Sequence, residues 1–389
     1  MKYEKFTIFE YDSLVEGYVY GGVSFTGTHN RLLQEFYKEE DFPYYKLIRK
    51  GVRFCQYVGV LQIGNLIIEV LPKADKTPPR HERELWRKML LGMLNAVDAL
   101  TVHVPSFSAL SLKQNSILDL YFEIFVTECE QLLHKGLVKK YRKVEGNSQA
   151  LKGRLNFVLN IQQNLTHKER FYISHTTYDS ENTLNCILLK VIKLLSKINR
   201  YTTITSRIGN LNLNFPELPD IHVSEKVFTR ISYNRKTERY RNAVNIARMI
   251  LLNLHPDVVG GKHHVLALMF DMNMLWERFV FKSLVKFKPQ SYFVTAKSRK
   301  HFWRSKGSPT TIIPDIFIDT KDGEHVVLDT KWKNIGGEAP SVHDLRQMYA
   351  YSKFYNNAKT ALVYPGLNFG LLAGNFLDEI ITVHLKQAE

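Results

Sequence analysis

Two aspartates and a lysine within one short segment are the residues of this sequence best suited to catalysis. The segment reads IIPDIFIDTKDGEHVVLDTKWK from residue 312, with Asp315 near its start and Asp329 and Lys331 near its end. Two runs of β-branched and apolar residues flank an Asp-Gly pair that is typical of hairpin turns, so the segment is predicted to be a β-hairpin. The register of that hairpin decides whether the three polar side chains meet.

Loop length sets the register. A two-residue loop would place Asp315 opposite Thr330, on the other face from Asp329, whereas a three-residue loop over residues 321–323 pairs Asp315 with Asp329. We predict the three-residue loop because its glycine then takes the left-handed position of a type I turn followed by a bulge. Lys331, two residues after Asp329, points to the same face.

Two carboxylates and an ammonium group on one face suit a divalent-metal site for phosphodiester hydrolysis. Mg²⁺ takes oxygen ligands, commonly one or two carboxylates with water and substrate phosphate, and Mn²⁺ is expected to substitute for it. Asp315 and Asp329 would bind the metal, and without it they would repel each other. Lys331 would position the attacking water or meet the developing negative charge. The alternative is an exposed hairpin with a surface ion pair.

Three further polar residues lie on predicted helices around the hairpin. Glu277 lies close to the apolar face of a helical stretch predicted over residues 266–286, where a glutamate is costly unless it is paired or metal-bound. It would assist at the metal, or lie on the helix surface. Gln347 and Tyr351 are four residues apart on a helix predicted over residues 342–354, so they share one face. They would hold DNA phosphates, or take part in ordinary helix packing.

A basic and aromatic segment, KSRKHFWRSK at residues 297–306, precedes the hairpin. Cations interleaved with aromatic rings are typical of DNA-backbone contacts and base stacking, although a solvated loop has the same composition. The candidate DNA-binding residues here are Lys297, Arg299, Lys300 and Arg304. The whole chain carries 53 Lys+Arg against 38 Asp+Glu, a net charge of +15, which favours a polyanionic partner.

The other elements must fold around these residues. With 389 residues, of which 44% are hydrophobic, the chain is long enough for two or three packed units. Residues 45–73 are predicted to be β-structure with a Gly64-Asn65 hairpin turn. Hydrophobic periodicity predicts helices over four further ranges, 85–100, 116–133, 182–199 and 237–254.

Several classes of protein are excluded by what the sequence lacks. No apolar run is long enough to span a membrane and no secretory signal begins the chain, so the protein is expected to be cytoplasmic. Its three isolated cysteines favour neither a disulfide framework nor a zinc site. A phosphate-binding loop is also absent, because Thr28 stands where its lysine must be, so another chain must supply any nucleotide-driven motion.

Taken in order, these motifs resemble two nested families. Glu277, Pro314-Asp315, Asp329-Thr330-Lys331 and Gln347-x-x-x-Tyr351 resemble the PD-(D/E)xK nuclease superfamily, in its subset with a QxxxY helix. Four further segments are similar to the McrC family: Phe270–Val280, Tyr57–Val60, Ile67–Lys73 and Leu151–Arg154. The likeness runs from about residue 57 to residue 351.

The resemblance implies an α/β fold, with a hairpin-rich α+β N-terminal region and a C-terminal mixed sheet flanked by helices. Residues 1–150 would dock to a hexameric AAA+ GTPase of McrB type and stimulate it. Residues 151–255 would be a helical region that connects the N-terminal region to the nuclease core, and residues 256–389 would form that core. The protein would then be the Mg²⁺-dependent DNA endonuclease subunit of a modification-dependent restriction complex. It would cut double-stranded DNA with paired nuclease domains.

Two other functions stay open. The chain could be a non-catalytic adaptor that regulates a partner NTPase. It could also be a stand-alone RecB-like repair exonuclease, which the large N-terminal half disfavours.

Overall fold

The computed structural model describes most of the chain in two compact units. The described residues are 4–37, 43–74, 83–97, 117–199, 202–255, 265–304, 308–321, 323–335, 338–366, 371–376 and 382–388. One unit comprises Met1–Ile117 together with His255–Glu389, and the other comprises Leu118–Leu254. Both contain helices and strands, so the predicted mixed α/β class is confirmed. None of the helices in the described residues is long and apolar enough to cross a membrane.

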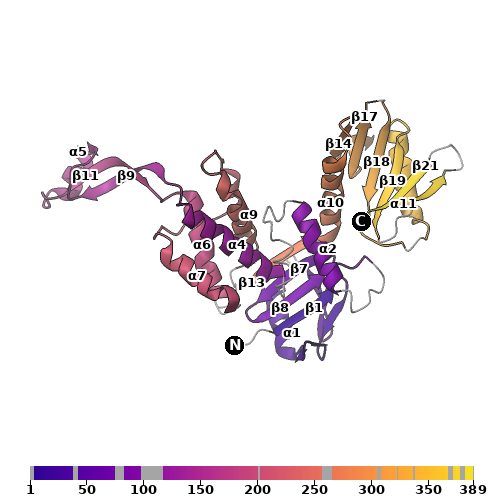
Figure 1. Cartoon of the computed structure of the whole chain (residues 1–389), viewed down its shortest axis with the longest axis horizontal. Helices are drawn as coiled ribbons and strands as arrows, with labels where there is room; N and C mark the ends of the chain where they lie inside the picture. The colour runs from indigo at the N-terminus through magenta and orange to yellow at the C-terminus, as the bar shows by residue number, and fades with distance from the viewer. Residues whose placement is uncertain are drawn as a thin grey trace. The chain divides into compact units, whose positions relative to one another are not determined.

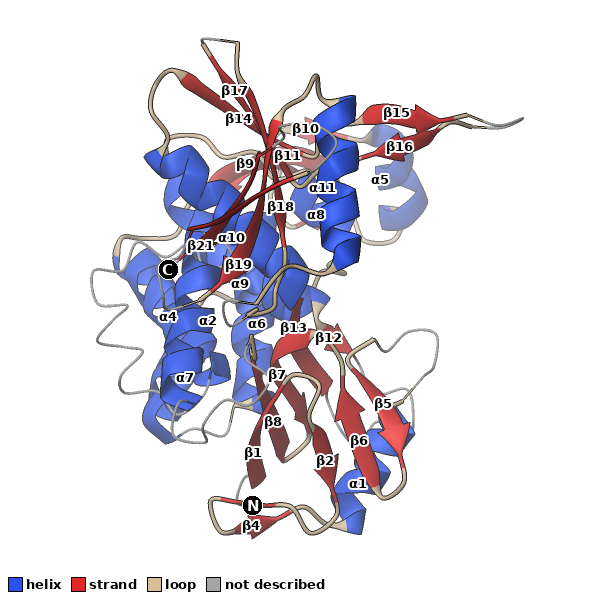
Figure 2. Ribbon diagram, turned by 90° about the vertical axis from the view of Figure 1, so that its right-hand side faces the viewer, coloured by secondary structure: helices blue, strands red, loops and turns tan. Residues whose placement is uncertain are grey.

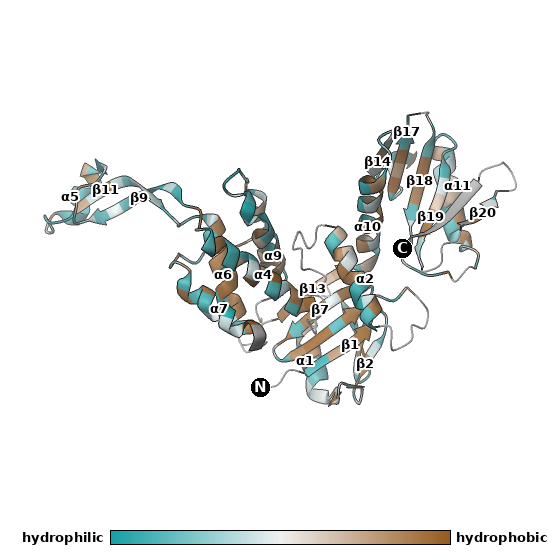
Figure 3. Cartoon of the chain, viewed as in Figure 1, coloured by the Kyte–Doolittle hydropathy of each residue, from teal (hydrophilic) through white to brown (hydrophobic). Residues whose placement is uncertain are grey.

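A five-stranded sheet forms the N-terminal part of the first unit (Figure 1). Its strands, in spatial order, are β1 (Glu4–Phe9), β8 (Leu66–Leu71), β7 (Tyr57–Ile63), β13 (Val265–Asp271) and β12 (Leu254–His255). β7 and β8 form the hairpin predicted from the Gly64-Asn65 pair, and Gly64 has a φ of +57°. β1 pairs parallel with β8. Figure 3 shows these strands as largely hydrophobic, as expected for a sheet covered by other elements.

Smaller elements cover this sheet. They are β2 (Ser13–Val15), β3 (Val19–Tyr20), β4 (Val23–Ser24), α1 (Gly27–Phe36), β5 (Tyr45–Ile48), β6 (Gly51–Phe54) and α2 (Arg83–Ala96). The β-structure predicted over residues 45–73 is therefore confirmed as β5 to β8. Glu69 of β8 is fully buried and pairs with Arg87 of α2 at 2.6 Å and with Lys5 of β1 at 3.2 Å. These ion pairs hold α2 against the sheet, since a buried carboxylate needs its partners.

The C-terminal part of the same unit is a six-stranded mixed sheet. In spatial order it contains β14 (Tyr292–Ala296), β17 (Ile316–Thr320), β18 (His325–Thr330), β19 (Lys359–Pro365), β21 (Thr382–Ala388) and β20 (Leu371–Asn375). β18, β19 and β21 run parallel, and the outer pairs are antiparallel. Helices α10 (Met272–Phe287) and α11 (Val342–Phe354) pack against it. The mixed sheet flanked by helices expected from the sequence is thus present.

A two-stranded ribbon is inserted between β14 and β17. It consists of β15 (Lys300–Trp303) and β16 (Thr310–Ile312), and it extends beyond α11 (Figure 2). Tyr355, just after α11, donates a hydrogen bond of 2.7 Å to Ser298 O at the base of the ribbon. Residues 300–303 of the basic and aromatic segment noted in the sequence therefore form a strand, and residues 305–307 lie outside the described residues.

The helix predicted over residues 266–286 is wrong in its first part. Residues 265–271 form β13, which pairs antiparallel with β7, and the helix begins only at Met272. The side chain of Asp271 caps it by accepting a hydrogen bond of 3.1 Å from Met274 N. A strand buried on both faces is a continuous apolar run, which periodicity alone cannot distinguish from a buried helix.

The second unit is mainly helical and carries an antiparallel sheet. Its helices are α4 (from Ile117 to His134), α6 (Thr183–Ile198), α7 (Thr202–Asn214), α8 (Glu225–Thr229), η2 (Glu238–Tyr240) and α9 (Arg241–Leu252). Its sheet contains β9 (Lys140–Ser148), β10 (Arg154–Leu155) and β11 (Phe171–Asp179), with α5 (Phe157–Asn164) following β10. The helices predicted over residues 85–100, 116–133, 182–199 and 237–254 correspond to α2, α4, α6 and η2 with α9. Residues 98–100 lie outside the described residues, and Leu254 belongs to β12 instead.

The expected domain boundaries do not all coincide with these elements. The boundary at residue 150 falls inside the β9–β10–β11 sheet. The one at residue 255 adjoins the end of the second unit, but β13 then places residues 265–271 in the five-stranded sheet rather than in the six-stranded one.

A substitution at Gly59 of β7 tests how closely β7 and β13 pack in the N-terminal sheet. Its φ is +134°, and a Cβ atom added there would lie 2.0 Å from Leu268 O of β13. We predict that Gly59→Ala lowers the free energy of unfolding by about 2 kcal/mol or more, through left-handed strain and the clash. Gly92→Ala, in α2 with nothing near the added methyl, is the control and should be neutral or stabilising. Urea unfolding measures both, and equal stabilities of the two variants would contradict the prediction.

Candidate functional site

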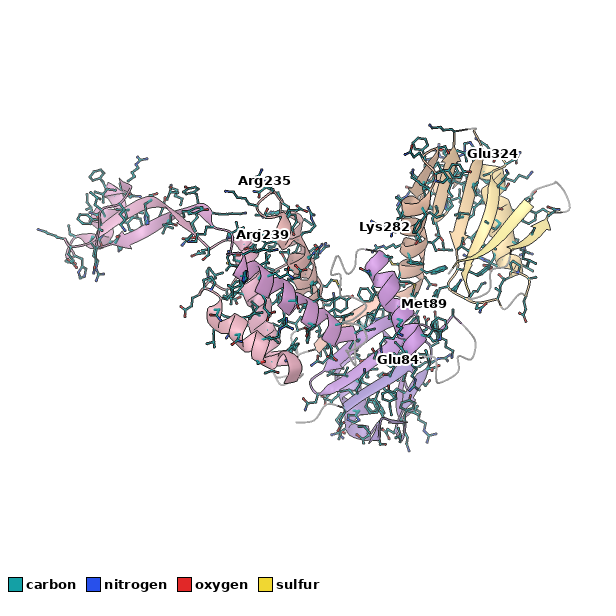
Figure 4. The ribbon with its side chains drawn as sticks, viewed as in Figure 1. Glu84, Met89, Arg235, Arg239, Lys282 and Glu324 are labelled. Atoms are coloured by element: carbon teal, nitrogen blue, oxygen red, sulfur yellow. The ribbon has the colours of Figure 1, made fainter. Side chains whose placement is uncertain are left out.

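The β17–β18 hairpin has the register predicted from the three-residue loop. Ile316 pairs with Leu328 and Asp319 with His325, a register that places Asp315 opposite Asp329. Thr320 accepts a hydrogen bond of 3.1 Å from Gly323 N, and Gly323 has a φ of +79°. The turn at residues 321–323 is therefore confirmed, with residue 322 outside the described residues. Glu324, labelled in Figure 4, directly precedes the returning strand β18.

Asp315 is held by the strand opposite. Thr330 donates two hydrogen bonds to Asp315 Oδ2, one from its backbone N and one from Oγ1, both of 2.7 Å. These bonds fix the carboxylate at the end of the hairpin next to Asp329. The role of Thr330 was missed in the sequence, because alternation places its side chain on the face opposite to Asp329 and gives no sign that it reaches Asp315.

Asp329 is a buried carboxylate with a mixed set of partners. Its side chain is 3% exposed, and its Oδ2 lies 2.7 Å from Lys331 Nζ. Gln347 Nε2 donates a hydrogen bond of 3.2 Å to Oδ1. Burial raises the pKa of Asp329 to about 6, the charge of Asp315 adds to the rise, and Lys331 opposes it. The two neighbouring carboxylates therefore favour a cation between them.

Lys331 extends from the same face as Asp329, as predicted. Its Nζ donates a hydrogen bond of 3.0 Å to Gln347 Oε1, and its backbone N donates one of 3.0 Å to Val363 O of β19. The ammonium group is thus shared between Asp329 and Gln347, at the end of β18 where the chain leaves the sheet. The structure brings the three residues of the hairpin motif together.

Gln347 and Tyr351 of α11 are hydrogen-bonded within the protein. Tyr351 is 3% exposed and donates a hydrogen bond of 3.0 Å to Ile313 O. Gln347 Nε2 donates one of 2.9 Å to the Tyr351 hydroxyl. Burial, followed by the charge of Asp329, raises the pKa of Tyr351 well above its usual range, so the hydroxyl stays a donor. Their contacts hold Asp329 and Lys331 in place, and the burial of Tyr351 argues against the expected grip on DNA phosphates.

Glu277 lies on α10 near the hairpin without joining a ligand cluster. Its Oε1 lies 3.3 Å from Lys297 Nζ. Burial raises its pKa, the charge of Asp315 adds to this, and Lys297 lowers it. Among the described residues, no three His, Cys, Asp or Glu side chains form a group that could hold a metal ion. The structure thus assembles Asp315 and Asp329 as a pair, with Glu277 electrostatically coupled to Asp315.

The four candidate cations of the ribbon segment divide into two kinds. Lys297 pairs with Glu277, and Lys300 donates a hydrogen bond of 3.0 Å to Phe354 O. Arg299 and Arg304 are exposed. The neighbouring aromatic side chains are also exposed, Phe302 by 47% and Trp303 by 60%. Two of the four cations are therefore fixed by the protein, and two face solvent beside aromatic rings.

The pair of carboxylates fits a Mg²⁺ site. Mg²⁺ is commonly bound by one or two carboxylates, with water and phosphate completing the shell. Asp329 Oδ2 is buried and, among the described residues, has no hydrogen bond of suitable geometry, although Lys331 lies beside it. A cation there would complete the coordination of that oxygen and relieve the repulsion that raises the pKa of Asp329.

The comparison with protein-family models identifies one family. A family model described as McrBC 5-methylcytosine restriction system component matches residues 52–365. No curated protein matches the chain. Among solved structures, the chain is similar to one in a refined half-complex from a tetradecameric assembly of Thermococcus gammatolerans McrB AAA+ hexamers with bound McrC. The sequence identity is 18%, the TM-score is 0.75, and the match covers 99% of this chain and 94% of the other.

A second solved structure gives a weaker match of the same kind. It is the cryo-EM structure of the Thermococcus gammatolerans McrBC complex, with 19% identity, a TM-score of 0.52, and coverage of 73% of this chain and 88% of the other. At these identities both structures show a common fold.

The raised pKa of Asp329 predicts a pH dependence of stability in the metal-free protein. Because its pKa is about 6 in the folded protein, against an ordinary 3.8, the folded state binds this proton more tightly than the unfolded chain. The stability due to this group is fully present below pH 4 and is lost as the pH rises through 6. In EDTA, we expect Asp329→Asn to exceed the wild type in unfolding free energy by about 1 to 3 kcal/mol at pH 8. A difference that stays constant from pH 4 to pH 8 would contradict this assignment.

Proposed function

The chain belongs to the family of McrBC 5-methylcytosine restriction system components, and from this premise we propose that it is the DNA-cleaving subunit of such a complex. It would hydrolyse phosphodiesters of double-stranded DNA with Mg²⁺. The observation that carries the proposal is the hairpin register that places Asp315 opposite Asp329, with Lys331 Nζ 2.7 Å from Asp329 Oδ2. This order of groups on a hairpin is that of a PD-(D/E)xK nuclease.

Asp315 and Asp329 would hold the metal. Bound Mg²⁺ polarises the scissile phosphate and lowers the pKa of a coordinated water. Lys331 would orient the attacking water or stabilise the negative charge of the transition state, from a position fixed by Gln347. Thr330 keeps Asp315 in place, and Glu277 would assist as a further acidic group beside it.

A partner GTPase is part of the proposal. One matched chain comes from an assembly of McrB AAA+ hexamers with bound McrC and the other from an McrBC complex. This chain has Thr28 where a phosphate-binding lysine would be needed. We infer that its N-terminal region docks to a hexameric AAA+ GTPase of this type and stimulates it. The nuclease domains would pair in the assembly, because cutting both DNA strands takes two active sites.

The ribbon is the proposed DNA contact nearest to the site. Arg299, Trp303 and Arg304 are exposed on it, and Lys297 N donates a hydrogen bond of 3.0 Å to Asp315 O at its base. Exposed guanidinium groups bind phosphates, and an exposed indole can stack on a base. DNA held by the ribbon would therefore lie close to the carboxylate pair.

Alanine substitution in the motif tests the nuclease assignment. With plasmid DNA, Mg²⁺, GTP and the partner motor, we expect Asp315→Ala, Asp329→Ala and Lys331→Ala each to reduce the cleavage rate by about 100-fold or more. Asp319→Ala is the matched control, since Asp319 lies on the same hairpin, is 46% exposed and bonds to His325. It should cleave like the wild type.

GTP turnover in the same reactions separates the two activities. The three motif variants should still stimulate the partner GTPase, because the substituted side chains belong to the nuclease part. Cleavage that persists in Asp329→Ala would overturn the catalytic assignment and leave the adaptor function, whereas unchanged GTP turnover on adding the wild-type chain would overturn the docking assignment.

The double variant Arg299→Ala/Arg304→Ala tests the ribbon. Losing two phosphate contacts should weaken DNA binding about equally for different sequences and should reduce the slope of log K against log salt by about two. Lys359→Ala is the control, because Lys359 is exposed on the same domain but pairs with Glu324 at 2.9 Å. Fluorescence anisotropy with labelled duplexes measures both, and identical salt slopes for the double variant and the wild type would exclude the ribbon as a DNA contact.

A further inference from the structure

β18 ends at Thr330, and the chain beyond Lys331 contacts residues at the end of the N-terminal sheet. Trp332 packs against the buried cluster of Phe9, Leu71, Ala74 and Trp86. Two residues later, Asn334 N donates a hydrogen bond of 2.9 Å to Ala74 O. The end of β18 is thus bound to the N-terminal sheet immediately beyond Lys331.

The ring of Trp332 packs against one tryptophan on α2 and another on α10. Its centroid is 6.4 Å from that of Trp86 on α2 and 5.5 Å from that of Trp276 on α10. Trp276 Nε1 donates a hydrogen bond of 3.3 Å to Val363 O, which is also the acceptor for Lys331 N. Met89, labelled on α2 in Figure 4, packs at the edge of the same cluster. The backbone around Lys331 is therefore held from the β19 side and from the N-terminal side.

Glu10 supplies the polar part of this contact. It directly follows β1, is 0% exposed, and accepts on Oε1 hydrogen bonds of 2.7 Å from Trp332 Nε1 and 2.6 Å from Lys73 N. Its Oε2 is buried and has no hydrogen-bond partner among the described residues. Burial raises the pKa of Glu10 to about 7. An acid kept in such a place costs stability, so packing alone does not account for it.

We propose that Glu10 is a positioning residue of the nuclease site: by bonding to Trp332 it fixes the backbone from which Lys331 reaches Asp329. Lys331 and Trp332 are successive residues, one directed to the carboxylate pair and the other into the N-terminal cluster. An anchor on Trp332 therefore limits the rotation of the peptide that carries Lys331. The N-terminal sheet, in addition to any contact with a motor, thereby completes the nuclease motif. This inference rests on the proposed nuclease function.

Three variants separate the hydrogen bond from the packing. Glu10→Leu removes the acceptor and keeps an apolar side chain of similar size. Trp332→Phe removes the donor and keeps a ring. Glu10→Gln keeps Oε1, and so both hydrogen bonds, without the charge. Asp12→Ala is the matched control, because Asp12 lies two residues after Glu10 and its carboxylate pairs with Lys73 Nζ at 3.1 Å.

The measurement is single-turnover cleavage of plasmid DNA by the full chain with its partner motor, Mg²⁺ and GTP. Misplacing a catalytic group by about 1 Å can cost about 100-fold in rate. We expect Glu10→Leu and Trp332→Phe to lower the maximal single-turnover cleavage rate by about tenfold or more, with an unchanged half-saturating protein concentration and unchanged GTP turnover. Glu10→Gln and Asp12→Ala should match the wild type. If Glu10→Leu and Trp332→Phe cleave like the wild type, or lose cleavage, GTP turnover and thermal stability together, the proposal is wrong.

A second readout does not depend on cleavage. Labelling of Lys331 by an amine-reactive reagent, quantified by mass spectrometry in the metal-free protein, reports how the ammonium group is held. We expect faster labelling in Glu10→Leu and Trp332→Phe but not in Asp12→Ala, and equal labelling in all four proteins would contradict the positioning role. If the wild type does not cleave DNA but Lys331 is still labelled faster in Glu10→Leu and Trp332→Phe, the proposed nuclease function is wrong and the positioning of Lys331 by Glu10 still holds.

Discussion

The antiparallel register of the β17–β18 hairpin places Asp315 opposite Asp329, and the remainder of the site depends on that pairing. A slip of one residue would turn one carboxylate to the other face of the sheet, because side chains alternate along a strand. The turn that sets the register needs a left-handed residue, which Gly323 provides with its φ of +79°. Thr330 then bonds to Asp315, and Lys331 lies beside Asp329, as consequences of the same register.

The candidate site and the Glu10–Trp332 contact both contain a buried carboxylate, and burying such a group costs stability. Asp329 and Glu10 are both buried acids whose pKa values are raised mainly by burial. At Asp329 the cost is offset in part by Lys331 and by the amide of Gln347, and a bound cation would offset more of it. At Glu10 two donors converge on one oxygen. Buried carboxylates of this kind lower the stability of the fold. Proteins commonly accept this cost at sites where they hold reactive groups in place.

Much of this arrangement follows from local sequence. The Asp-Gly turn and the period of two predict that Asp315, Asp329 and Lys331 meet, and the Gly64-Asn65 pair predicts the β7–β8 hairpin. Other features depend on tertiary contacts. Residues 265–271 are a strand because β7 offers a partner, and Tyr351 is buried and bonds to Ile313 O, which follows the ribbon in the chain. The bond between Glu10 and Trp332 joins residues 322 positions apart, so no local pattern could predict it.

The central claim is that Asp315 and Asp329 together bind one divalent metal ion beside Lys331. Anomalous diffraction from crystals grown with Mn²⁺ tests it most directly, because the ion is located independently of any activity. We predict one anomalous peak per chain, about 2 Å from carboxylate oxygens of both aspartates. Crystals with well-ordered carboxylates and no peak between them, or with the ion bound elsewhere, would contradict the account.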